Sequence, residues 1–206
     1  MTGSSTPPPS RRRDSEAHRR LLEAAAQVLA TDGPHDLSLR RVAALAGGST
    51  QMVYTLFGGK PGLADALYAE GFVRLAAAVL QELQGAPPPG DPERMIAIGR
   101  GYRRFAVTEP GFFSVMFGRA IPGFTAHRET RSAGRDSTFG LVVRCAQECL
   151  DAGTLVGGPA EQLAQRCWAN GHGLASLEVA GLLVADDLDA FVEAALRVPV
   201  DAARPR

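Results

Sequence analysis

Seven polar residues between positions 38 and 60 carry the side chains of this chain that are best suited to recognition chemistry. Their hydroxyl and amide groups donate and accept hydrogen bonds, and the ammonium of the only lysine, Lys60, pairs with anions such as phosphate. They include no nucleophile paired with a base, so the chemistry that they suggest is binding. These residues are Ser38, Ser49, Thr50, Gln51, Tyr54, Thr55 and Lys60.

Two short helices joined by a tight turn are expected to position these side chains. In the segment LRRVAALAGGSTQMVYTLFGGK (39–60), apolar residues recur at helical spacing on both sides of Gly47-Gly48. Ser38 and Ser49 are favourable N-caps, and glycine adopts the left-handed backbone that a tight turn requires. We therefore predict a helix over 39–46, a glycine turn and a second helix that begins after Ser49.

The second of these helices has two different faces. Val53, Leu56 and Phe57 share an apolar face, and the polar residues lie largely on the other. A helix-turn-helix with such faces can lay its second helix in the major groove of DNA. Solvent exposure is the alternative explanation of a short polar face. The large outward side chain of Tyr54, and the place of Lys60 before the next helix, where a phosphate can bind, favour DNA.

Helices are also expected on both sides of this segment. Apolar residues at helical spacing predict a helix over 15–31, which ends at an Asp-Gly-Pro sequence, and a longer helix over 61–84. Residues 1–14 are rich in Ser, Thr and Pro and are predicted to form a disordered arm. Its three consecutive arginines (11–13) are either solvated or reach phosphates or a minor groove. The predicted DNA-binding domain covers 15–60, and the long helix connects it to the rest.

The composition limits the class of protein. Hydrophobic residues make up 45% and charged residues 21% of the 206 residues, an ordinary globular balance, and no apolar run reaches the roughly 18 residues of a membrane span. Residues 1–60 hold eight Lys and Arg against five Asp and Glu, and the remainder holds 14 against 17, a weak indication of nucleic-acid binding. The polar N-terminus is not a secretory signal and three cysteines fit a reducing compartment, so we expect a cytoplasmic protein without membrane association.

The stretch from Leu21 to Phe72 resembles the DNA-binding domain of the TetR family of bacterial transcriptional regulators. The matching features are an Ala-rich first helix, a Gly-Pro break, Ser38, an Ala-Gly turn, Ser49, the pair Val53-Tyr54, Phe57 and Lys60. Two residues depart from the family pattern. Gly48 stands where a valine is usual, which removes an apolar side chain from the turn, and Leu56 stands where a polar or aromatic residue is common.

The resemblance implies a homodimer that binds a roughly palindromic operator in double-stranded DNA, usually as a repressor. By position, Thr50, Gln51 and Thr55 are the candidates for contacts with base edges, and the amide of Gln51 can pair bidentately with adenine. An effector bound elsewhere would favour a state in which the long helix has moved and the dimer no longer fits its operator. The residues that would hold phosphates are Ser38, Tyr54 and Lys60.

The remaining part of the chain, 91–198, is expected to bind a small-molecule effector and to form the dimer. Helical spacing predicts helices over 91–108, 112–117, 159–184 and 187–197, and one of about 20 residues that ends near residue 153. Its aromatic residues and methionines either form the core or line a cavity for an apolar effector. The candidate pocket residues are Phe105, Phe112, Phe113, Met116, Phe117, Trp168 and His172.

Trp168, followed by Gly171-His172-Gly173, resembles the C-terminal domain of a TetR subgroup named for a Trp/His-Gly signature. In the family the last two helices form a four-helix dimer interface. His172 is therefore either a partly buried histidine near that interface or a ligand contact. The predicted fold is all-α, with an N-terminal three-helix helix-turn-helix domain and a C-terminal helical ligand-binding and dimerisation domain.

Enzymes and metal centres are poorly supported. The chain lacks a Gly-rich phosphate loop, a G-x-S-x-G elbow, an HExxH motif and a paired-carboxylate signature, so we predict no catalytic residue, no cofactor and no metal site. Cys145, Cys149 and Cys167 suggest a thiol sensor or a metal site, but their spacing is typical of neither. A helical ligand-binding dimer that does not bind DNA is the remaining alternative, and only the two departures from the family pattern favour it.

Overall fold

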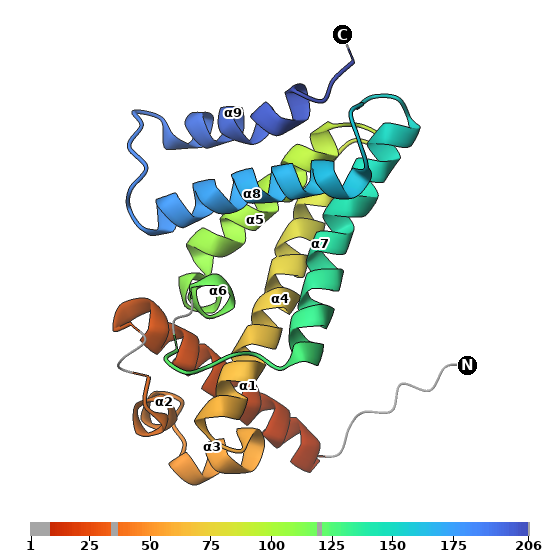
Figure 1. The fold of residues 1–206 in the computed structure, drawn as a ribbon. Helices are drawn as coiled ribbons and strands as arrows, with labels where there is room; N and C mark the ends of the chain where they lie inside the picture. The colour runs from red at the N-terminus through yellow and green to blue at the C-terminus, as the bar shows by residue number, and fades with distance from the viewer. Residues whose placement is uncertain (1–8, 34–36, 119–120, 206) are drawn as a thin grey trace, which may run out of the picture. The chain divides into compact units, whose positions relative to one another are not determined.

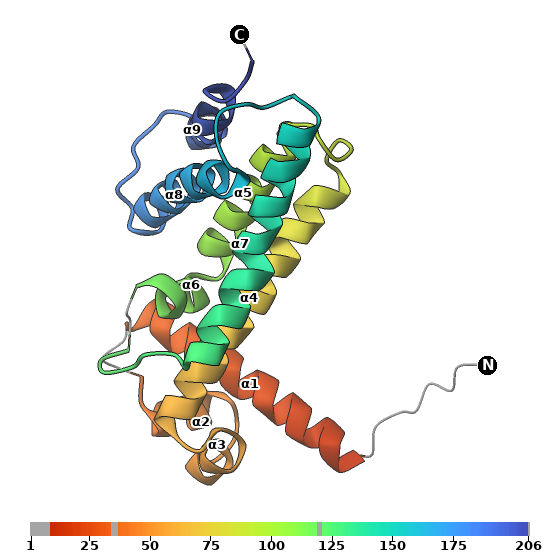
Figure 2. The same cartoon turned by 45° about the vertical axis from the view of Figure 1, so that its right-hand side comes forward.

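The computed structural model describes residues 9–33, 37–118 and 121–205, with side chains from Arg13 onward. Every regular element in these residues is an α-helix (Figure 1, Figure 2), which confirms the predicted all-α fold. Contacts divide the chain into two compact units. The first unit comprises 1–69 and 111–127, and the second comprises 70–110 and 128–206.

The first unit contains the predicted helix-turn-helix. The face of α1 that carries Leu21, Ala25 and Val28 is buried, as expected for residues spaced four and three apart on an amphipathic helix. Val42 of the second helix and Val53 of the third are completely buried, so these three helices share one core. The helices of this unit are α1 (Pro9–Thr31), α2 (Leu39–Leu45), α3 (Thr50–Phe57), the first part of α4 (Lys60–Gln84) and α6 (Pro110–Phe117).

Helix α1 begins earlier than the sequence indicated. It starts at Pro9 and not at Ser15, so the prediction of a disordered arm over 1–14 is wrong for Pro9–Asp14. Proline is well accommodated in the first turn of a helix because no N–H partner is needed there, and arginine has a high helix propensity. Residues 1–8, and the side chains of Arg11 and Arg12, lie outside the described residues.

The long helix α4 matches its prediction, and it begins directly after α3. Gly58 ends α3 in a left-handed conformation (φ 71°), and its N–H donates to the carbonyl oxygen of Tyr54 at 2.9 Å. Gly62 is the third residue of α4. It lies so close to α3 that a Cβ there would be 1.8 Å from the Phe57 carbonyl oxygen. Only glycine fits at this contact, which holds the end of α3 against the start of α4.

Residues 111–127 belong to the first unit, although the predicted C-terminal domain, 91–198, included them. At the start of α6, a Cβ on Gly111 would lie 2.0 Å from the carbonyl oxygen of Ala26 in α1. At the end of the following loop, the backbone N–H of His127 donates to Asp65 Oδ1 of α4 at 2.9 Å. These two contacts join residues far apart in sequence, so helical spacing did not reveal them.

The second unit is built around α5, which packs against α7, α8 and α9. Met95, Ile96 and Phe105 of α5 are buried, as the helical spacing predicted. Helix α8 ends at Val179, five residues before its predicted end, because Gly181 leaves the helix in a left-handed conformation (φ 69°). The helices of this unit are the second part of α4, α5 (Glu93–Thr108), α7 (Arg128–Asp151), α8 (Ala160–Val179) and α9 (Leu188–Asp201).

Helix α9 is longer than predicted and contains a proline. Its N-cap is Asp187, which accepts the N–H of Ala190 at 2.9 Å, and it continues through Pro199 to Asp201. Proline has no N–H to donate to the carbonyl four residues earlier, which is that of Ala195. The side-chain amide of Asn170 in α8 donates to this carbonyl at 3.0 Å, so the group remains hydrogen-bonded and α9 continues.

Among the described residues, no helix combines the length and the apolar character that crossing a membrane requires.

Candidate functional site

The turn between α2 and α3 is closed by the predicted caps. Ser38 Oγ accepts the N–H of Arg41 at 3.2 Å and Ser49 Oγ accepts the N–H of Met52 at 3.3 Å, so each serine caps one helix. Gly47 has a left-handed backbone (φ 67°), as the turn requires. Both serines are exposed, so their hydroxyl hydrogens can still be donated to a phosphate.

Gly48 does not leave a gap in this turn. Its N–H donates to the carbonyl oxygen of Ala43 at 2.8 Å. A Cβ at this position would lie 3.2 Å from Met52 Sδ, so the methionine side chain packs where a larger residue would stand. The departure from the family pattern is thus filled from within α3, by a residue that the sequence did not single out.

The outward face of α3 carries the predicted polar side chains. Thr50, Gln51, Tyr54 and Thr55 are all exposed, and Tyr54 retains 56% of its accessible surface. Val53 on the opposite face is completely buried, which fixes the rotation of α3 about its axis. The Thr55 hydroxyl donates to the carbonyl oxygen of Gln51 at 3.0 Å, so its oxygen is left to accept a hydrogen bond. The face therefore presents amide, hydroxyl and phenol groups together.

Tyr54 and Lys60 lie beside the N-terminus of α4. A Cβ on Gly59 would be 3.3 Å from the Tyr54 ring, so this ring packs against the backbone that leads into α4. Lys60 is the first residue of that helix and is half-buried. The first N–H groups of a helix lack partners within it and carry a partial positive charge. With the lysine ammonium they form a site suited to a phosphate.

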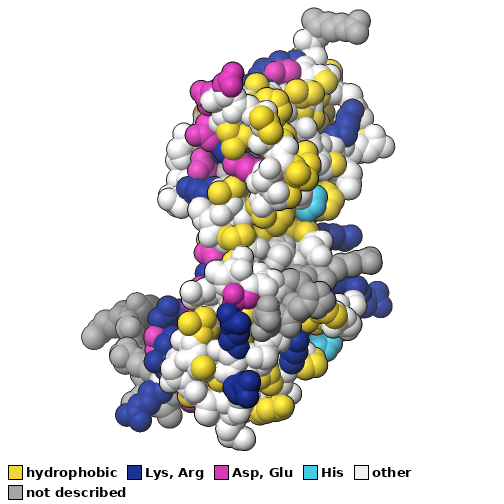
Figure 3. All heavy atoms as spheres, turned by 90° about the vertical axis from the view of Figure 1, so that its left-hand side faces the viewer, with side chains coloured by type: hydrophobic (Ala, Val, Ile, Leu, Met, Phe, Trp, Pro, Cys, Tyr) yellow, Lys and Arg dark blue, Asp and Glu magenta, His cyan; other side chains and the backbone are white. Residues whose placement is uncertain are grey.

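Helix α1 holds the other two helices in place. The rings of His18 and Phe57 lie 4.6 Å apart between centroids, which ties α1 to the end of α3. Arg41 of α2 pairs with Asp32 after the end of α1 at 2.6 Å. Figure 3 shows Lys and Arg side chains spread over the surface of the first unit, in the lower part of the picture. The unit thus presents its polar helix on a support of packed helices.

Comparison with known proteins agrees with this geometry. Residues 21–67 match the family model described as "Bacterial regulatory proteins, tetR family". Residues 95–198, half of the chain, match the model described as "Tetracyclin repressor-like, C-terminal domain". The chain belongs to the TetR family. Members of this family are DNA-binding transcriptional regulators that bind effectors and act as dimers, which confirms the predicted class of function and the prediction that the chain is not an enzyme.

Two solved structures and one curated protein are similar to this chain at 19–32% sequence identity. A solved structure of a protein with unknown function from Rhodococcus sp. RHA1 is 32% identical and has a TM-score of 0.78, over 92% of this chain and 96% of that one. A TetR family transcription regulator from Marinobacter aquaeolei VT8 is 19% identical and has a TM-score of 0.74, over 95% and 100% of the two chains, which shows the shared fold. The HTH-type transcriptional regulator Rv1816 of Mycobacterium tuberculosis (strain ATCC 25618 / H37Rv) is 26% identical over 144 residues, 69% of this chain. The chain spans 58% of the length of that curated relative.

The seven predicted pocket residues of this TetR-family chain are divided between the two units. Phe112, Phe113 and Met116 of the first unit are buried and Phe117 is half-buried. In the second unit, Phe105 is almost completely buried. Core packing therefore accounts for most of these side chains. The two remaining residues, which are half-buried in the second unit, are Trp168 and His172.

His172 takes part in a polar cluster inside the second unit. Its Nδ1 is 2.7 Å from the hydroxyl oxygen of Tyr102, its Nε2 is 3.4 Å from Ser176 Oγ, and its ring centroid is 5.6 Å from that of Trp168. Burial lowers the pKa of His172, and burial also raises the pKa of Tyr102, which a hydrogen bond with Trp168 partly opposes. Both groups are therefore neutral near pH 7. Helical spacing alone does not indicate that Tyr102 is the partner of His172.

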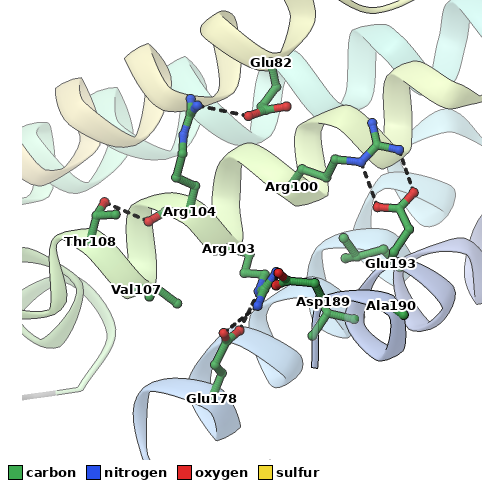
Figure 4. Close-up of a pocket in the computed structure, with 12 residues that line it drawn as sticks. Glu82, Arg100, Arg103, Arg104, Val107, Thr108, Glu178, Asp189, Ala190 and Glu193 are labelled. Carbon is green, nitrogen blue, oxygen red and sulfur yellow. Dashed lines mark hydrogen bonds and ion pairs between the residues drawn. The ribbon is translucent and has the colours of Figure 1, made fainter. Parts of the chain in front are cut away.

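A cavity of about 630 Å³ opens in the second unit between α5 and α9, with the ends of α4 and α8 at its sides. Three arginines of α5 line it, and Figure 4 shows Arg103 between Glu178 and Asp189. Arg103 forms two hydrogen bonds with Glu178, both at 2.7 Å, which raise the pKa of the arginine. The predicted apolar pocket does not coincide with this cavity, because ion pairs line the cavity. The spacing of Arg100, Arg103 and Arg104 on one side of a helix was the available signal.

The thiols do not form a metal centre. Within the described parts of the chain, no three His, Cys, Asp or Glu side chains are arranged to hold a metal ion. Cys145 and Cys149 are buried and hydrogen-bonded to each other, which raises the pKa of Cys145 and lowers that of Cys149. Burial raises the pKa of Cys167 to about 11. A thiol of that pKa is protonated and poorly reactive near neutral pH.

Proposed function

We propose that this TetR-family chain is a homodimeric repressor that binds a palindromic operator. Binding of a small-molecule effector would release the repressor from the operator. The observation that carries the proposal is the exposed face of α3, where the predicted residues lie together beside the N-terminus of α4. A recognition helix of this kind enters a major groove, and a dimer reads two half-sites about one helical turn apart. Because its target is chromosomal DNA, the protein would act in the cytoplasm.

Residues of this surface divide by chemistry into two groups. Gln51 has the amide that pairs bidentately with adenine, and the exposed Thr50 and Thr55 lie within one turn of it on the same helix. These three residues would read base edges. The residues that would hold phosphates, together with the exposed cap Ser49, are Ser38, Tyr54 and Lys60.

The dimer interface would be formed by α8 and α9. Leu177 of α8 is 43% exposed, and Phe191 and Val198 of α9 are 47% and 63% exposed. Large apolar side chains that remain accessible on two neighbouring helices are typical of a surface covered by a partner. A second copy of the same two helices would cover them in a four-helix arrangement around a two-fold axis.

The effector would be an apolar molecule with a hydrogen-bonding group. In the second unit, the half-buried Trp168 would supply accessible aromatic surface, and the neutral pair of His172 and Tyr102 would supply the hydrogen-bonding group. Release of DNA requires that the effector bind one state of the dimer more tightly than the other. Helix α4, which runs from the first unit into the second, is the element proposed to move.

DNA binding is tested by fluorescence anisotropy with labelled palindromes taken from the DNA that flanks the gene. Tyr54→Ala and Lys60→Ala are expected to weaken binding about tenfold or more, because each removes a phosphate contact. Gln51→Ala is expected to relax the sequence preference at one base pair, which corresponds to about 1–3 kcal/mol. Val184→Ala, a change at a residue 96% exposed in the second unit, is the control. Wild-type affinity of the Tyr54 and Lys60 variants would contradict the proposed DNA interface.

A thermal-shift screen tests the effector site. An apolar ligand that binds the folded protein raises its unfolding temperature by an amount that grows with ligand concentration. The shift is expected to be lost in Trp168→Ala and reduced in His172→Ala. A ligand that shifts both variants as it shifts wild type binds elsewhere, and the cavity lined by the α5 arginines is then the site to test.

A further inference from the structure

A groove of about 710 Å³ lies in the first unit between the N-terminal half of α1 and the recognition helix α3. One wall belongs to α1 and the other to the start and outward face of α3. The predicted base-reading residues Gln51 and Thr55 line the groove, with Ser49 at the N-terminus of α3. This hollow is therefore continuous with the proposed DNA interface.

Two arginines of α1 face this groove. Arg13 and Arg20 both line it and both are exposed. They are seven residues apart, two helical turns, which places them on one side of α1 about 10 Å apart along its axis. Opposite them stand the hydroxyl and amide groups of α3. The groove thus offers guanidinium groups on one wall and hydrogen-bonding groups on the other, which is the combination that binds a phosphate strand.

Two carboxylates, Asp14 and Glu16, also line the groove, and they differ in their ion pairing. Glu16 Oε1 accepts a hydrogen bond from Arg19 at 2.7 Å, so its charge is compensated by an arginine of the same helix. Asp14 is exposed and lies next to Arg13 in the chain. The arginines would attract a phosphate in the groove and Asp14 would repel it. Removing the arginines should therefore lower the DNA affinity and removing Asp14 should raise it, so the two effects can be measured in separate variants.

We propose that this groove seats one sugar-phosphate strand of the operator, with Arg13 and Arg20 binding phosphates beside the bases that α3 reads. The occupant follows from the two exposed arginines and from continuity, because the wall that carries Arg13 and Arg20 faces the helix that is proposed to enter the major groove. The inference rests on the proposed DNA-binding function. It also assigns a role to the amino-terminal half of α1, which is helical from Pro9 and holds both arginines on a rigid support.

The salt dependence of DNA binding tests this assignment. Each phosphate neutralised by an arginine contributes about −0.9 to the slope of log K against log[salt], so Arg13→Ala with Arg20→Ala is expected to reduce the slope by about 1.8 for each bound protomer. Between 50 and 200 mM salt, wild type then loses about 12-fold more affinity than the double variant for each bound protomer, and about 150-fold more for a bound dimer. The loss should be equal for operator and random duplexes, since phosphate contacts carry no sequence information.

Three further variants control this experiment. Arg13→Lys with Arg20→Lys keeps the charges and should keep most of the slope. Asp14→Asn should raise the affinity about twofold at low salt, because it removes the repelling charge. Arg131→Ala removes an exposed arginine of α7 in the second unit and should leave the slope unchanged. Thermal unfolding of each variant verifies that it is folded.

The outcomes separate this inference from the proposed function. If wild type binds its operator and the Arg13, Arg20 double variant has the same salt slope, the groove does not hold a phosphate strand and the DNA-binding function stands. An unchanged affinity of Asp14→Asn together with an unchanged slope would overturn the inference in the same way. If wild type binds no duplex, both the proposed function and the inference are wrong.

Discussion

Gly62 is the residue whose substitution should most directly link the packing of α3 against α4 to DNA binding. A Cβ there would lie 1.8 Å from the carbonyl oxygen of Phe57 and 2.9 Å from its carbonyl carbon. A comfortable contact is about 3.5 Å, so Gly62→Ala requires the end of α3 to move by roughly 1.5 Å from the start of α4. The obstacle is backbone, which cannot rotate away as a side chain can.

The expected cost follows from two opposing effects. Overpacking of this kind destabilises a protein by about 1–3 kcal/mol, whereas alanine in place of glycine inside a helix stabilises it by up to about 1 kcal/mol. We expect Gly62→Ala to lose about 1–2 kcal/mol of unfolding free energy. A shift of roughly 1.5 Å would also break the hydrogen bonds that α3 is proposed to form with DNA, so affinity should fall by about tenfold or more.

Urea unfolding and anisotropy with operator DNA measure these two effects. Gly140→Ala is the matched control, because it lies within α7 and a Cβ there would meet only Arg144 Nη1 at 3.6 Å. It should be as stable as wild type or more so, and should bind DNA normally. The single tryptophan, Trp168, lies in the second unit, so its native emission should not change in Gly62→Ala. Wild-type stability and affinity of Gly62→Ala would refute the close contact between α3 and α4.

Two other predictions concern the second unit. Asn170→Ala should destabilise the protein by about 0.5–1.5 kcal/mol in urea unfolding, because the Ala195 carbonyl in α9 loses its hydrogen-bond donor. Asn170→Asp should have a similar effect, because a carboxylate cannot donate a hydrogen bond to this carbonyl. Hydrogen bonds from Arg100, assisted by Arg197, lower the pKa of Glu193 from 4.5 to about 2. Its contribution to stability is therefore complete above about pH 4.5 and lost as the pH falls towards 2. The difference in urea midpoint between wild type and Glu193→Gln should shrink over that range, and a difference independent of pH would contradict the assigned ion pair.

The local features of the DNA-binding unit could be predicted from the sequence because they depend on neighbours in the chain. Ser38 and Ser49 cap helices that begin directly after them, and Gly47 supplies the turn. The rotation of α3 follows from the spacing of Val53 and its apolar neighbours, so the exposure of Tyr54 followed as well. The start of α1 is also a local property. The polar composition of residues 9–14 predicts disorder, whereas the helix propensity of arginine favours the helix that the structure shows.

Contacts between distant segments were decided by the tertiary structure alone. Helical spacing shows which residues share a face, but it does not show which other helix that face meets. The grouping of 111–127 with α1 depends on the contact of Gly111 with Ala26, and the continuation of α9 through its proline depends on Asn170 of another helix. The groove beside α3 also depends on a contact between distant segments of the chain. Arg13 and Arg20 stand more than 25 residues before Gln51, and only the packing of α1 against α3 brings their charges to the helix that is proposed to read DNA.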